Sequence, residues 1–132
     1  MKRLLQLTTL IEVPTGLALI IVPGFVVHLL LRAEISGAGI PLGRLGGTAV
    51  LGLGVASWLA SYSPDNCASR GVVTAMLIYN IGATLILGEA LVHSPLVDVV
   101  LGSVVLLHAA LAAWCATCLL SRKPHVAQPT AL

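Results

Sequence analysis

Charged side chains are scarce in this sequence: seven Lys or Arg and five Asp or Glu make up 9% of its 132 residues. Ordinary soluble domains carry a charge on about a quarter of their residues. A chain this short has a large surface relative to its volume, and so few charges would leave most of that surface apolar in water. The scarcity of charge excludes an ordinary soluble domain and indicates that lipid is the solvent.

Cysteines and basic patches are lacking as well. Three cysteines, at positions 67, 115 and 118, are too few and too unevenly spaced for a disulfide framework. The net charge is only +2, and no basic stripe with interleaved aromatic residues occurs, which excludes nucleic acid as a partner. The basic start Met1-Lys2-Arg3 resembles a secretory signal, but Glu12 and Pro14 interrupt the apolar run behind it, which favours a retained first helix.

Apolar residues dominate instead, at 58% of the chain and a mean hydropathy of +1.02. A helix that spans a membrane needs roughly 20 apolar residues. Four stretches meet this requirement: residues 4–22, with an extension to residue 31 left open, and residues 45–62, 71–92 and 96–120. The sequence therefore predicts an all-α integral membrane bundle of four transmembrane helices with up-down topology. Residues 1–120 form its single domain, and residues 121–132 a flexible polar tail.

The basic residues predict an orientation. Four spans place both termini on one side of the membrane, and that side holds five basic residues against two on the other. By the positive-inside rule both termini are cytoplasmic, in the inner (plasma) membrane of a bacterial cell. The five are Lys2, Arg3, Arg70, Arg122 and Lys123, and the two are Arg32 and Arg44.

Small residues predict where the helices pack. Such residues recur every fourth position in the second and fourth spans, which allows close contact between helix backbones in lipid. The expected faces are Thr48, Gly52, Ala56 and Ala60, extended by Gly43 and Gly47, and, in the last span, Ala109, Ala113 and Thr117.

Polar residues within the spans are the main indicators of function, because their burial in hydrocarbon is unfavourable. Glu12 lies ~12 Å into the first span at 1.5 Å per residue, and Asn80 and His108 lie at a similar depth from the same face. The predicted ligand-binding residues are Glu12, Tyr79, Asn80, Thr84 and His108. The alternative is that this cluster only ties the helices together.

A metal site is not predicted. His28, Glu89 and His93 would meet at the opposite membrane face, where polar residues that reach toward the headgroups are the favoured explanation. His108 has no second histidine at a matching depth, so the sequence does not favour haem.

Cys115-Ala-Thr-Cys118 is the sharpest local motif. Such a pair can exchange electrons with a disulfide or provide half of a zinc site. In the predicted orientation both thiols face reducing cytosol, and small apolar cysteines are common packing residues, so packing is the favoured interpretation.

Three segments resemble small DoxX-like four-helix proteins of bacteria: Leu10-Ile-Glu-Val-Pro-Thr-Gly-Leu17, the Gly-rich stretch from Arg44 to Gly54 with Trp58, and Tyr79-Asn80. The position of His108 in the last span is also similar. Some DoxX-like proteins belong to quinone-linked sulfur-oxidising systems, so the resemblance implies a quinone as the cofactor to consider. It assigns no catalytic residue.

The leading hypothesis is a non-enzymatic structural or accessory membrane protein that binds a lipid or quinone at the polar cluster. Its partners would be the bilayer and either a larger membrane complex or further copies of the chain. One alternative is a quinone-linked thiol oxidoreductase that uses Cys115 and Cys118. Another is a proton-coupled small exporter centred on Glu12, which resembles the membrane-embedded Glu of small multidrug-resistance exporters.

Overall fold

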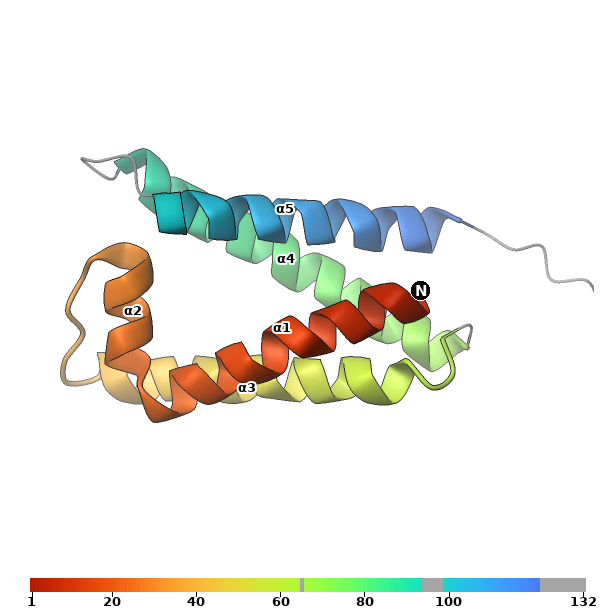
Figure 1. Cartoon of the computed structure of the whole chain (residues 1–132), viewed down its shortest axis with the longest axis horizontal. Coiled ribbons are helices and arrows are strands. Elements are labelled where there is room, and N and C mark those ends of the chain that lie inside the picture. The colour runs from red at the N-terminus through yellow and green to blue at the C-terminus, as the bar shows by residue number, and fades with distance from the viewer. Residues whose placement is uncertain (65, 94–98, 122–132) are drawn as a thin grey trace, which may run out of the picture.

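The computed structural model describes residues 1–64, 66–93 and 99–121, which form five α-helices and no strand. The helices are α1 (Lys2–Ile21), α2 (Pro23–Leu31), α3 (Gly39–Ala60), α4 (Cys67–His93) and α5 (Val99–Leu120) (Figure 1). All but α2 are long and apolar enough to cross a membrane. The prediction of an all-helical chain with four long apolar helices is confirmed.

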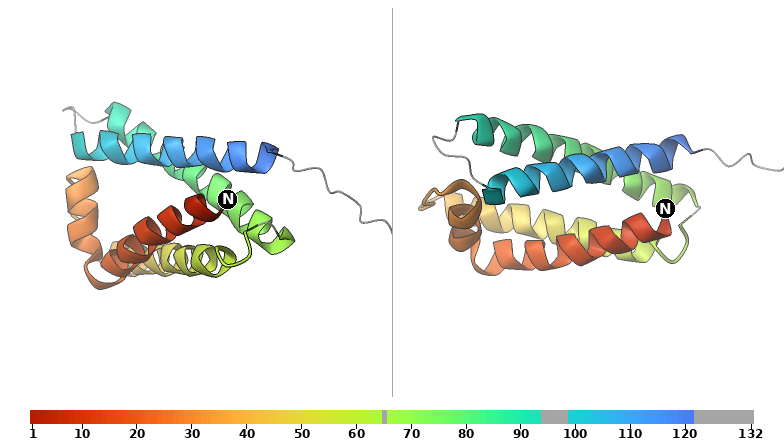
Figure 2. Two further views of the ribbon diagram at one scale, coloured as in Figure 1. Left: turned by 45° about the vertical axis from the view of Figure 1, so that its right-hand side comes forward. Right: turned by 45° about the horizontal axis from the view of Figure 1, so that its top comes forward.

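The first apolar stretch is not one helix that extends to residue 31. Helix α1 ends at Ile21, because Val22 leaves helical geometry at φ −131° and Pro23 has no N–H with which to continue the ladder. Pro23 instead begins α2, at a position where proline is favoured. Helix α2 lies across one end of the molecule and contacts α1, α3 and α5 (Figure 2). The prediction that the first span continues as one helix to residue 31 is therefore wrong.

Two other spans begin earlier than predicted. Helix α3 begins at Gly39 because Pro41 falls in its first turn, where the missing N–H breaks no hydrogen bond. Helix α4 begins at Cys67, and the Asn66 side chain accepts a 2.7 Å hydrogen bond from the backbone N–H of Ser69. The predicted start of the last span at residue 96 and the tail from residue 122 lie outside the described residues.

The helices form two antiparallel pairs, α1 with α3 and α4 with α5. Glycines bring the first pair into backbone contact. A Cβ atom on Gly47 would lie 2.8 Å from the carbonyl oxygen of Gly16, and one on Gly16 would lie 2.6 Å from the backbone nitrogen of Leu51. Only glycine allows this approach, so the predicted role of Gly47 in packing is confirmed.

The remaining small-residue positions are confirmed only in part. A Cβ atom on Gly43 would lie 2.9 Å from Cβ of Pro23, and Ala60 packs against buried apolar side chains. Other positions are wrong. A Cβ atom on Gly52 would meet nothing within 4 Å, and Thr48 is exposed. On α5, Ala109, Ala113 and Thr117 are all exposed. Small residues line more than one side of α3, and their spacing alone does not indicate which side faces a neighbouring helix.

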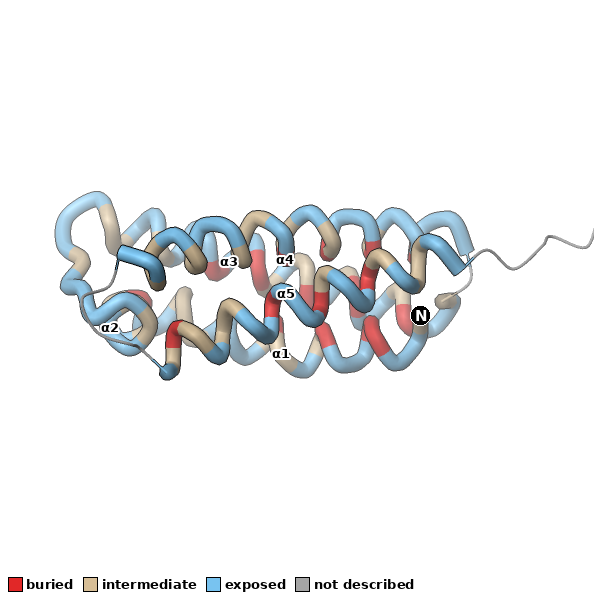
Figure 3. Tube along the Cα trace, turned by 90° about the horizontal axis from the view of Figure 1, so that it is seen from above, coloured by how far each residue is buried: buried red, intermediate tan, exposed pale blue. Residues whose placement is uncertain are grey.

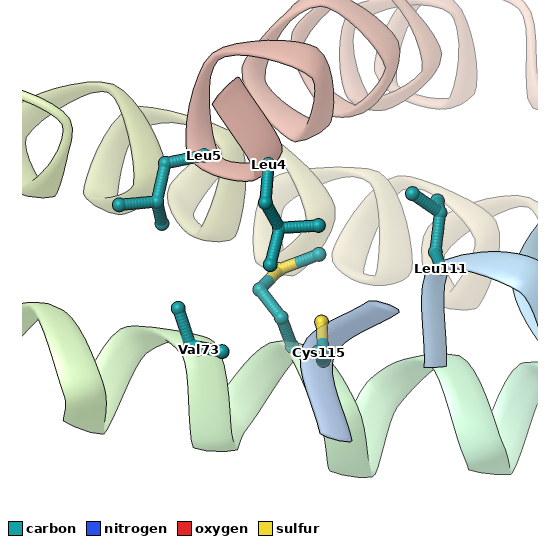
Figure 4. Close-up of a cluster of buried hydrophobic side chains, with 6 residues drawn as sticks. Leu4, Leu5, Val73, Leu111 and Cys115 are labelled. Atoms are coloured by element: carbon teal, nitrogen blue, oxygen red, sulfur yellow. The ribbon is translucent and has the colours of Figure 1, made fainter. Parts of the chain in front are cut away.

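A compact apolar cluster joins the two pairs near the first turns of α1 (Figure 4). It combines side chains of α1, α4 and α5. Elsewhere the usual distribution is inverted: large hydrophobic side chains are more often exposed than buried, and buried positions on the inner helix faces include many polar residues (Figure 3). The cluster consists of Leu4, Leu5, Val73, Met76, Leu111 and Cys115.

Candidate functional site

Three polar residues from three helices are buried in the middle of the molecule. Glu12 of α1 is 1% exposed, Asn80 of α4 is 0% exposed and His108 of α5 is 9% exposed. Each lies on the side of its helix that faces the other helices, because the opposite sides carry the exposed apolar residues. The three residues that the sequence placed in a common slab are therefore all interior.

Asn80 and His108 bind each other directly. Nδ1 of His108 lies 2.8 Å from Oδ1 of Asn80, and Nδ2 of Asn80 donates a 2.8 Å hydrogen bond to the carbonyl oxygen of Met76. Because the Asn80 oxygen can only accept, Nδ1 of His108 carries the hydrogen and Nε2 of the neutral ring is left as an acceptor. The pair joins α4 to α5 and fixes the orientation of the imidazole.

Two further predicted residues flank this pair. The Tyr79 ring packs edge-on against the His108 ring, with centroids 5.6 Å apart, and Tyr79 also packs against the apolar cluster that contains Leu4 and Leu5 of α1. The hydroxyl of Thr84 donates to the carbonyl oxygen of Asn80 at 2.7 Å, so its hydrogen bond lies within α4. Tyr79 thus links the Asn80–His108 pair with α1.

Glu12 is not bonded to that pair. Its Oε1 atom is buried and has no hydrogen-bond partner within the described part of the chain. The same is true of the hydroxyls of Thr8, one turn earlier on α1, and Ser57 of α3. Sequence reasoning missed Ser57, although the spacing Gly47, Val50, Gly54 and Ser57 marks the buried face of α3.

An apolar cavity of about 470 Å³ lies beside the polar residues. Its walls come from α1, α3 and α4, and Tyr79 is the residue that connects it to the polar cluster. Several wall residues of α3 are exposed, so the cavity reaches the outer surface of the helices. The lining residues are Leu19, Gly46, Ala49, Val50, Gly52, Leu53, Ala56 and Tyr79.

The cysteine motif lies elsewhere. Cys115 is fully buried, and its sulfur points into the apolar cluster of Leu4, Val73 and Leu111 (Figure 4). Cys118 is half-buried, and both thiols are free. Cys67, at the start of α4, is exposed. This arrangement gives Cys115 a packing role and leaves its thiol without access to a large substrate.

At the other end of the helices, His28 and His93 each contact a different partner and do not form one cluster. Nδ1 of His28 lies 3.0 Å from Oε1 of Glu34, and Nδ1 of His93 lies 2.8 Å from the carbonyl oxygen of Glu89. Over residues 1–64, 66–93 and 99–121, no three His, Cys, Asp or Glu residues are grouped to hold a metal ion.

Comparisons of the chain with protein-family models, with curated proteins and with solved structures give no significant match.

Proposed function

We propose that this chain is a small integral membrane protein that binds a lipid-soluble molecule with a polar head, a quinone or a lipid, in the cavity beside Tyr79. It crosses the bacterial inner membrane four times in alternating directions, with both termini in the cytoplasm, and acts as an accessory binding protein without catalytic chemistry. The observation that carries this proposal is an apolar cavity with a polar cluster behind one wall.

The inverted surface supports a membrane location. Large exposed side chains such as Leu10, Ile78 and Leu85 would be unfavourable in water, and they cover the outer faces of the helices. The buried Asn80 side chain forms its hydrogen bonds within the bundle, to Met76 and His108, as a hydrocarbon solvent favours. The DoxX-like resemblance agrees with this location and with a quinone ligand.

The cavity supports binding of an amphiphile. Pockets for small organic ligands usually measure about 300–1,000 Å³ and combine apolar walls with a few polar groups, and 470 Å³ falls within that range. A quinone ring with part of its chain suits such a space. Tyr79 is the one residue of the cavity wall with a polar side chain, and its ring packs edge-on against the His108 ring of the polar cluster.

The two alternatives receive less support from the geometry. A thiol oxidoreductase requires an accessible thiolate, but Cys115 is buried among apolar side chains. An exporter centred on Glu12 requires its substrate to reach that carboxyl, but Glu12 is not among the residues that line the cavity.

The proposal is tested by titrating the detergent-purified protein with decylubiquinone and following the fluorescence of Trp58 and Trp114. Ala49→Phe, which fills the cavity, should abolish binding, whereas Ala110→Phe, at an exposed position of α5, a helix that contributes no residue to the cavity wall, should not.

Native mass spectrometry of the wild-type protein then distinguishes a copurified quinone from a copurified phospholipid. The proposal fails if neither copurifies and decylubiquinone does not bind. It also fails if Ala49→Phe binds decylubiquinone as the wild type does.

A further inference from the structure

The apolar cavity is open along one side of α3. Gly46, Ala49 and Gly52 all line the cavity, and all three are exposed. They follow one another at intervals of three residues, so they lie along the same side of the helix. The opening therefore runs along the flank of α3.

The two glycines of this opening are not required for helix packing. A Cβ atom on Gly46 or Gly52 would meet nothing within 4 Å, whereas one on Gly47 would lie 2.8 Å from a backbone oxygen of α1. Glycine inside a helix costs about 1 kcal/mol relative to alanine. At these two positions that cost brings no closer contact between helices, and its effect is to leave the opening free of side chains.

Both ends of the cavity are covered by packed residues. Toward α2, a Cβ atom on Gly43, three residues before Gly46, would lie 2.9 Å from Cβ of Pro23, the first residue of α2. Toward the start of α4, Ala60 lies one turn beyond the wall residue Ala56 and packs against the apolar cluster of Figure 4. The flank of α3 is therefore the side from which a ligand reaches the cavity.

The opening lies in the middle of the helix. Helix α3 has 22 residues, from Gly39 to Ala60. At about 1.5 Å per residue, Gly46 lies about 10 Å from its first residue and Gly52 about 12 Å from its last. Both distances place the opening within the hydrocarbon layer, about 30 Å thick, that the proposed function puts around α3. A ligand that enters at this depth comes from the lipid and not from water.

The cavity wall carries no charged side chain among the residues that the structure describes. Tyr79 is its one polar residue, and every Lys and Arg of the described chain is exposed. Arg44, the basic residue nearest to the opening along α3, lies about 140° around the helix from Ala49 at about 100° per residue. A phosphate or carboxylate head in the cavity would have no cationic partner, and burial of an unpaired charge is unfavourable. The wall therefore favours an uncharged head.

We propose that the cavity takes up an uncharged, chain-bearing molecule directly from the hydrocarbon layer, through the opening between Gly46 and Gly52 on the flank of α3. This inference rests on the proposed binding function and specifies its ligand class and its route of entry. A quinone meets both requirements, because its head is neutral and its chain keeps it dissolved in lipid. A phospholipid does not, because its head is charged and stays at the membrane surface.

The test is stopped-flow mixing of decylubiquinone with the protein reconstituted in lipid vesicles, followed by quenching of tryptophan fluorescence. Ala49→Phe, in which the cavity is filled, gives the signal of quinone that is only dissolved in the lipid. A leucine at either end of the opening obstructs it, so Gly46→Leu and Gly52→Leu should each slow association and dissociation by the same factor and retain Kd. Gly71→Leu, at an exposed glycine of α4 that meets no neighbour and lies outside the cavity wall, should bind at the wild-type rate.

Association at the wild-type rate in both Gly46→Leu and Gly52→Leu would overturn the side opening, while binding by the wild type would still support the cavity. A weaker Kd at an unchanged association rate would overturn it too, because these glycines would then only line the wall. Decyl phosphate, which has the same chain length but a charged head, should not compete with decylubiquinone, and equal competition would overturn the ligand class. If the wild type does not bind decylubiquinone, the proposed function fails together with this inference.

Discussion

At the scale of single residues, Gly47 shows how little space separates α1 from α3. A methyl group at this position would lie within 2.8 Å of the backbone of α1, which has no flexible side chain there to move aside. The neighbouring Gly46 is open, because a Cβ atom there would meet nothing within 4 Å. Two adjacent glycines therefore have opposite structural roles.

Gly47→Ala should destabilise the protein by roughly 1–3 kcal/mol, because the added methyl group forces the helix backbones apart. Gly46→Ala should be neutral or stabilise it by up to about 1 kcal/mol, because alanine favours the helix over glycine. Chemical unfolding in detergent, followed by tryptophan fluorescence, measures both changes. Equal stability of the two variants would show that α1 and α3 do not meet at Gly47.

The polar residues show how far a single sequence predicts a site. Asn80 and His108 could be placed together because depth along two spans is counted directly from residue number. Glu12 lies at the same depth but has no bond to them, because depth does not determine which way a helix is turned. The burial of Ser57 follows from the rotation of α3, which only the contact with α1 determines.

At the scale of elements, the start of α4 depends on local capping. The Asn66 side chain accepts from the backbone N–H of Ser69, and the Ser69 hydroxyl donates back to the carbonyl oxygens of Ala60 and Ser63. These bonds join the end of α3 to the start of α4. They satisfy helix-end groups that would otherwise need water.

Asn66→Ala should lower the free energy of unfolding by about 1 kcal/mol, the usual effect of removing a helix cap, whereas Asn66→Ser should retain most of it. Hydrogen exchange at the Ser69 amide should accelerate in the alanine variant alone. Unchanged exchange at Ser69 would show that Asn66 does not cap α4.

Prolines explain why the number of long helices was predicted correctly while their first and last residues were not. Pro14 lies inside α1, Pro23 begins α2, and Pro41 falls in the first turn of α3. Proline is tolerated in the first turn of a helix, where no backbone hydrogen bond is lost. Inside a helix it removes one backbone hydrogen bond, but the helix can continue past it. Hydropathy identified the four long helices, but it could not distinguish these three roles.

At the scale of the whole molecule, the exposed Cys67 reports on orientation. It lies at the same end as the first residues of α1 and the last turn of α5 (Figure 1). Ser36, an exposed residue between α2 and α3, lies at the opposite end. The two positions can therefore be compared on one molecule.

A membrane-impermeant maleimide should modify Cys67 only after cells are lysed, because the proposed orientation places it in the cytoplasm. In a variant that combines Cys67→Ser with Ser36→Cys, the new thiol should react in intact cells. Mass spectrometry reads both results, and Cys115 should react only after unfolding. The reverse pattern would mean that both termini face outward.

The pairing of α1 with α3 also has a consequence for biogenesis. Both members of this pair, and the glycine contact between them, lie within the first 60 residues. The ribosome therefore completes the first pair before α4 is made, and domains generally fold in the order of synthesis. The first pair can therefore form while the second is still emerging, and the apolar cluster around Leu4 and Cys115 can form only once α4 and α5 have been made.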